Sequence, residues 1–103
     1  MNRIELPNKI ATEVKNLTFD FASLLAASET ISTKVVTAAV YSGTDASPSS
    51  IISGSATSSG TVVTQLITGG TLGVIYELTC TITTSASQTL VLVGYMAVIP
   101  KVP

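Results

Sequence analysis

Apolar and polar residues alternate with a period of two along most of the chain from residue 17 onward. The clearest run follows Gly73, where apolar residues alternate with mostly polar ones at Val74, Tyr76, Leu78, Cys80 and Ile82. A period of two places successive side chains on opposite faces of a β-strand. Further strands, separated by Gly- and Ser-rich turns, are predicted at 17–21, 29–41, 51–52, 61–68 and 89–99.

The spacing of these strands predicts an all-β fold, a single immunoglobulin-like Greek-key β-sandwich of about six to eight strands. A chain of 103 residues forms one domain by size. The first residues are polar, contain Pro7 and show little periodicity. We therefore predict an N-terminal extended arm at residues 1–16 and a β-sandwich domain at residues 17–103. From the residues alone, the arm is either a frayed terminus or a segment that docks on a neighbour.

Two of the predicted strands depart from simple alternation. The strand at 29–41 is irregular near Lys34–Val36, which indicates a bulge or a strand that switches sheets. The strand at 89–99 is apolar on both faces apart from Thr89 and Gly94. A strand of that kind is covered on both faces. The second face is then covered by a neighbour or by the chain's own arm, unless this strand switches sheets.

A few residues are predicted to hold the sandwich together. Phe19 and Phe21 are expected in the core. Gly73-x-x-Tyr76 predicts a tyrosine corner, in which the phenol hydroxyl bonds back to the backbone; the alternative is a tyrosine that only fills the core or its rim. Cys80 is the one cysteine of the sequence, so no internal disulfide can form. Its place in an apolar run predicts a buried inert thiol, with an intermolecular disulfide as the alternative.

Charge is scarce in this chain. Only 11% of residues are charged, the net charge is −1 and 46% of residues are hydrophobic, with a mean hydropathy of +0.56. Ser and Thr supply 29 residues. A surface of hydroxyls and short apolar groups is easier to desolvate than one of Lys and Glu, which favours contacts with other proteins. The candidate contact residues are Arg3, Ile4, Leu6 and Pro7 on the arm and Tyr95 on the last strand.

Several functional classes are disfavoured by the same residues. The scattered cations argue against nucleic-acid binding. No apolar run reaches the ~20 residues of a membrane helix, and the first residues lack the apolar core of a secretory signal. The sequence has no histidine, which excludes the His-based nucleophilic triads and the commonest metal ligand. The acidic residues are dispersed, and the Gly-rich pieces lack a phosphate-loop Lys. We expect no catalytic residue, no metal and no cofactor.

Several pieces in a fixed order are similar to a known family. They are 19–25, Ser28–Ile31, Gly43-x-Asp45, Gly60-x-x-Val63-x-Gln65-x-Ile67-x-Gly69-Gly70, Gly73-x-x-Tyr76-x-Leu78-x-Cys80 and Gln88-x-Leu90. This order, over about residues 17–99, resembles the phage fiber-tail adaptor proteins, which are immunoglobulin-like virion proteins of tailed bacteriophages. The chain departs from the family at Phe21, where members have Trp, and at Ser28, where they have Gly.

The resemblance implies a non-enzymatic structural protein of the virion, assembled in the host cytoplasm, that acts as an adaptor at the neck or tail-fibre attachment region. The implied partners are other virion proteins in a symmetric multi-copy assembly: neck, portal, tail or fibre components, or the major capsid protein. A capsid decoration protein on the phage head is an alternative. A carbohydrate-binding or adhesin-like module, and a pilin-like subunit that donates residues 1–16 to the next copy, are alternatives of other classes.

Overall fold

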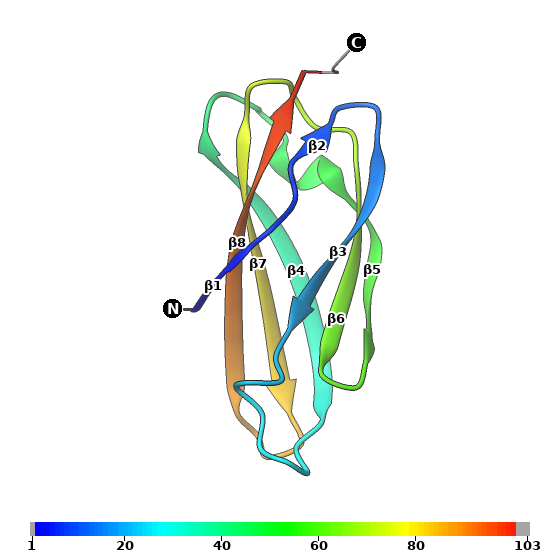
Figure 1. Ribbon diagram of the computed structural model, residues 1–103, viewed down its shortest axis with the longest axis vertical. Coiled ribbons are helices and arrows are strands. Elements are labelled where there is room, and N and C mark those ends of the chain that lie inside the picture. The colour runs from blue at the N-terminus through cyan, green and yellow to red at the C-terminus, as the bar shows by residue number, and fades with distance from the viewer. Residues whose placement is uncertain (1, 101–103) are drawn as a thin grey trace.

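The alternating residues form extended strands in the structure, a computed structural model that describes residues 2–100. Figure 1 shows the strands packed as an elongated sandwich, with principal extents of 46 × 23 × 22 Å. The elements in chain order are β1 (Asn2–Glu5), β2 (Lys9–Ile10), β3 (Val14–Asp20), β4 (Ile31–Ser42), the short 3-10 helix η1 (Pro48–Ile51), β5 (Ile52–Ser59), β6 (Val62–Thr68), β7 (Ile75–Thr84) and β8 (Thr89–Ile99).

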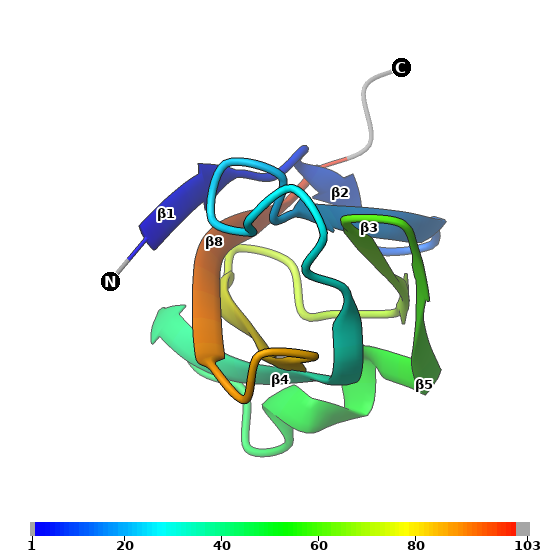
Figure 2. The same ribbon diagram turned by 90° about the horizontal axis from the view of Figure 1, so that it is seen from below.

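The strands form two sheets that face each other across one core (Figure 2). The larger sheet has the order β1-β8-β7-β4, with β2 also paired to β8, and the smaller sheet has the order β3-β6-β5. Within the larger sheet, β4, β7 and β8 pair antiparallel. The prediction of an all-β sandwich is confirmed.

The core lies between the sheets and contains the residues that the alternation placed on one face. In β7, every second residue from Tyr76 to Thr84 is buried and the residues between them are half-buried. Phe19, Phe21 and Cys80 are fully buried. Burying one apolar face of each strand against the opposite sheet is the main stabilising contribution to such a fold.

The N-terminal residues belong to the larger sheet of their own chain. Strands β1 and β2 both pair parallel with β8, so that Ile4 lies opposite Gly94 and Lys9 opposite Val98. Strand β3 then begins at Val14, within the segment that the sequence assigned to the arm. Ile4 and Leu6 pack against the core.

The two strands with irregular patterns, β4 and β8, both lie in the larger sheet. Strand β8 stays in the larger sheet throughout: its inner face is buried in the core, and β1 and β2 lie at its edge. The bulge or sheet switch predicted near Lys34–Val36 was wrong, because β4 stays paired with β7 in a regular register from Thr33 to Val40. The register shifts of β4 lie outside that stretch, between Ile31 and Thr33 and between Val40 and Ser42. Lys34 shares the inward side of β4 with Val36, but it lies near the open edge of the sandwich and remains exposed there. A polar residue at this position therefore requires no bulge.

Candidate interaction surfaces

The outer side of the larger sheet is a surface with very little charge. Alternation places on it the residues that lie between the buried ones of β4, β7 and β8. We call this surface the threonine face; it consists of Thr33, Val35, Thr37, Ala39, Glu77, Thr79, Thr81, Thr83, Thr89, Val91 and Tyr95. Glu77 is its one charged member. Covering such a surface with another protein removes few ionic groups from water.

Side chains of the threonine face also bond to one another. The hydroxyls of Thr33 and Thr83 are hydrogen-bonded across β4 and β7. The Tyr95 hydroxyl donates to Glu77 Oε2 at 3.2 Å. The ring of Tyr95 lies 4.4 Å, centroid to centroid, from that of Tyr41, whose exposed fraction is 60%. These contacts order the surface before any partner arrives, which lowers the entropy lost on binding.

The tyrosine at the predicted corner joins three segments of the chain. The Thr71 backbone N–H donates to the Tyr76 hydroxyl at 2.8 Å, and that hydroxyl donates to Asp45 Oδ2 at 2.5 Å. Gly73, at φ +86°, provides the turn that leads into β7. Burial, followed by the bond to Asp45, raises the pKa of Tyr76. The same bond and that from the Ser47 N–H lower the pKa of Asp45.

Sequence reasoning missed the role of Asp45, because 31 positions separate it from Tyr76. Other carboxylates are also used within the fold. Glu29 accepts from the Thr84 hydroxyl and from the Ala26 N–H, and these two bonds lower its pKa. Asp20 accepts from the Ala22 N–H and the Thr61 hydroxyl. These carboxylates stabilise loops.

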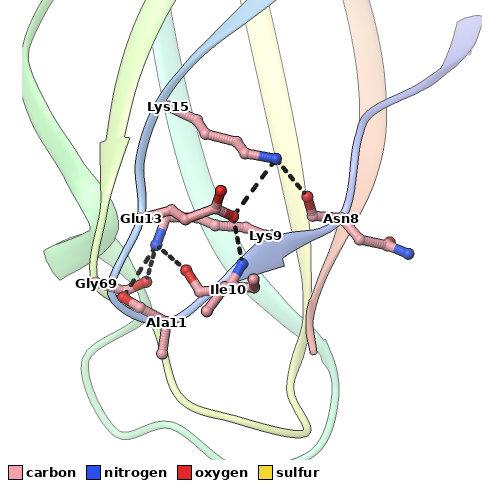
Figure 3. Close-up of polar contacts among 7 residues, drawn as sticks. All are labelled: Asn8, Lys9, Ile10, Ala11, Glu13, Lys15 and Gly69. Atoms are coloured by element: carbon pink, nitrogen blue, oxygen red, sulfur yellow. Dashed lines mark hydrogen bonds and ion pairs between the residues drawn. The ribbon is translucent and has the colours of Figure 1, made fainter. Parts of the chain in front are cut away.

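A buried lysine fixes the N-terminal strands to the rest of the sandwich (Figure 3). Lys9 is fully buried, and its ammonium donates to the carbonyl oxygens of Gly69, Ile10 and Ala11 at 2.6, 3.0 and 3.2 Å. Burial lowers the pKa of Lys9, and Glu13 opposes that effect. No signal in the sequence marks Lys9 as buried, since Gly69 lies 60 positions away.

The neighbouring polar residues complete this anchor. Glu13 Oε1 accepts from the Ile10 N–H at 2.8 Å and pairs with the Lys15 ammonium at 3.5 Å. Lys15 also donates to the Asn8 carbonyl at 2.9 Å. The bond from Ile10 is the main cause of the lowered pKa of Glu13. The turn between β2 and β3 is therefore held on both sides.

The predicted contact residues do not form one surface. Ile4 and Leu6 pack against the chain's own core. Pro7 is exposed and Tyr95 is half-buried on the threonine face. The backbone of Arg3 pairs with Val93, and its side chain lies outside the described part of the structure.

Three further properties of the described residues concern metal binding, membrane crossing and thiol reactivity. Among residues 2–100, no group of three or more His, Cys, Asp or Glu is arranged to hold a metal ion. No helix within that range has the length and apolar character to cross a membrane. Cys80 is buried, and burial raises the pKa of its thiol to about 12.

Comparison with known proteins identifies the family. The family described as podophage GP4 fiber-tail adaptor protein gp77 matches residues 9–93. No curated protein matches the chain. The family match runs from the buried Lys9 of β2 to Val93 of β8, and so includes most of both sheets. The resemblance found in the sequence is thereby confirmed: the chain belongs to the podophage fiber-tail adaptor family.

Proposed function

We propose that this protein is a non-enzymatic structural adaptor of a tailed-phage virion, which joins other virion proteins at the neck or tail-fibre attachment region. The observation that carries the proposal is the family match over residues 9–93. Its partners are neck, portal, tail or fibre proteins, and it is incorporated in several symmetric copies during assembly in the host cytoplasm. We assign it no catalytic step and no cofactor.

The threonine face supports an adaptor role because of its physical properties. It is broad, lies on paired strands that hold it rigid, and has Glu77 as its one charged member. A rigid surface that is easily desolvated suits a permanent contact within an assembly. Several copies arranged around one axis would let individually weak contacts add up.

The strand order supports the immunoglobulin-like part of the proposal. In that fold, strands B, E and D form one sheet and C, F and G form the other. Here β3, β6 and β5 occupy the first set of positions and β4, β7 and β8 the second. Strands β1 and β2 add to the last of these as a parallel edge.

Two matched substitutions test the adaptor role and the surface together. Thr81→Lys places a charge in the centre of the threonine face, on β7. Thr64→Lys places the same charge on β6, the central strand of the smaller sheet; both threonines are half-buried. Each variant is supplied to a phage that lacks the gene, and its copies per purified particle are counted by quantitative mass spectrometry. We expect Thr81→Lys to lower incorporation several-fold and Thr64→Lys to leave it unchanged.

Other outcomes would contradict the proposal in distinct ways. Absence of the unaltered protein from purified particles would exclude a virion role. Binding to tail-less heads, but not to portal or tail complexes, would indicate a capsid decoration protein. Binding to a glycan array that is lost in Tyr41→Ala would indicate a carbohydrate-binding module, since Tyr41 is the most exposed large hydrophobic residue described.

A further inference from the structure

Strand β4 is a long edge strand with one side unpaired. It ends the larger sheet, so its backbone is paired with β7 on one side and, among residues 2–100, with no strand on the other. Its register with β7 is regular from Thr33 to Val40, and Lys34 is the one charged residue in that stretch. An exposed edge of this kind can add a further strand from another chain.

The edge strands of the smaller sheet are less suited to such pairing. Strand β5 is irregular between Ser53 and Thr57, where its register with β6 shifts. The buried Gln65 donates from Nε2 to the carbonyl oxygens of Ser53 and Gly54 at 3.0 and 3.2 Å. A bulge held in this way blocks regular pairing along β5. At the other edge, β3 has only seven residues, and it carries Lys15 and Asp20.

A pocket adjoins the β4 edge on the side that faces the smaller sheet. It lies where β4 and β5, one from each sheet, approach each other, and its volume is about 260 Å³. The lining is apolar or uncharged apart from Lys34, and includes Val36, Ile52, Ala56 and Gln65. Figure 2 shows β4 and β5 on neighbouring sides of the sandwich. A strand added to β4 could direct a side chain into this pocket.

Lys34 gives the pocket a positive charge with which no described residue forms an ion pair. With the residues that the structure describes, Lys34 forms no hydrogen bond and no ion pair, whereas Lys9 and Lys15 each form several contacts. The carboxylates Asp20, Glu29 and Asp45 accept hydrogen bonds from other residues of the chain, namely Thr61, Thr84 and Tyr76. A carboxylate on a strand added to β4 could therefore pair with Lys34 without displacing a partner among the described residues.

We propose that β4 receives an extended segment of another virion protein, which pairs with residues 33–39 and places an Asp or Glu carboxylate against Lys34. This inference rests on the proposed adaptor function for the source of the segment. It adds a second contact, separate from the threonine face, with a defined backbone geometry and a defined charge. A lysine on an edge strand can also act alone to prevent edge pairing, and the experiment below separates the two roles.

Chemical cross-linking in purified phage particles tests the contact directly. A zero-length carbodiimide joins an amine to a carboxylate only where the two touch. We expect a cross-linked peptide that connects Lys34 with an Asp or Glu of a different virion protein. We also expect acetylation of Lys34 to be at least tenfold slower in particles than in the free protein. Hydrogen exchange at residues 33–39 should slow to a similar extent, because the outward backbone groups of β4 become bonded.

Matched variants show whether the charge matters. Lys34→Gln and Thr18→Glu change the net charge by the same amount, and both lie on exposed positions of edge strands. Lys34→Gln should lower incorporation into particles about tenfold, whereas Thr18→Glu and Lys34→Arg should not. Circular dichroism of each purified variant checks that it folds.

The opposite results distinguish this inference from the adaptor function. If the protein is present in particles but Lys34 is acetylated as fast as in the free protein, and residues 33–39 exchange equally fast, the strand contact is refuted and the adaptor function stands. If the protein is absent from particles, both are refuted.

Discussion

Leu6 lies directly over Gly94, the residue of β8 that has no side chain. A Cβ atom at position 94 would come within 2.6 Å of both Cγ and Cδ1 of Leu6, and within 3.2 Å of Cγ1 of Ile4. Gly94 therefore leaves the space in which the N-terminal segment packs against the core. The apolar residues Ile4 and Leu6 of the N-terminal segment therefore pack against β8 at Gly94.

The contact between Leu6 and Gly94 is expected to show strong coupling. Gly94→Ala should lower the free energy of unfolding by about 1–3 kcal/mol through overpacking, and Leu6→Ala by about 1–3 kcal/mol through lost burial. The double variant should lose clearly less than the sum, because Leu6→Ala empties the space that the new methyl group needs. Urea denaturation measures all three values, and strictly additive losses would show that the two residues are not in contact.

Lys9 is expected to contribute to stability although it is a buried cation. Lys9→Met keeps much of the side-chain volume but leaves the carbonyls of Gly69, Ile10 and Ala11 without their donor. We expect a loss of about 1–3 kcal/mol in the free energy of unfolding. The matched control is Lys15→Met, which removes a partly exposed ion pair with Glu13 and should cost less than about 1 kcal/mol. Equal losses in both variants would contradict burial of the Lys9 ammonium.

The bond between Tyr76 and Asp45 predicts a dependence of stability on acid pH. The folded-state pKa of Asp45 lies below its ordinary value of 3.8. The resulting stabilisation is fully present above the unfolded-state pKa and is lost as the pH falls through the folded-state pKa. Asp45→Asn should therefore lower the melting temperature at pH 7, and the difference from the unaltered protein should shrink toward pH of about 2. A difference that is the same at both pH values would show that the carboxylate charge is not involved.

Cys80 should be unreactive in the folded protein. It lies opposite Val36 and Leu92 on the paired strands, is fully buried, and has a thiol pKa raised to about 12. Because the thiolate is the reactive form, a disulfide reagent at pH 8 should label Cys80 rapidly in guanidinium chloride and very slowly in its absence. Rapid labelling of the native protein would show that Cys80 is accessible, and would reopen the alternative of an intermolecular disulfide.

The larger strands could be predicted because each carries its own pattern. The alternation after Gly73 defines β7 almost to the residue, and the apolar run at 89–99 coincides with β8. A strand that buries one face has a single register that puts its apolar residues inside, so local sequence is enough to identify it. Burial of Phe19, Phe21 and Cys80 follows from the same reasoning.

The contacts that join distant segments could not be predicted from the sequence and are visible only in the tertiary structure. The parallel pairing of β1 with β8 connects residues about 90 positions apart along the chain. Nothing in the local sequence of either strand indicates that the two pair. Lysine is usually a surface residue, and only the fold places the Lys9 ammonium 2.6 Å from the carbonyl oxygen of Gly69. Local periodicity specifies which face of a strand is buried. The strand that pairs with an edge, and the group that binds a buried charge, depend on the tertiary fold of the whole chain.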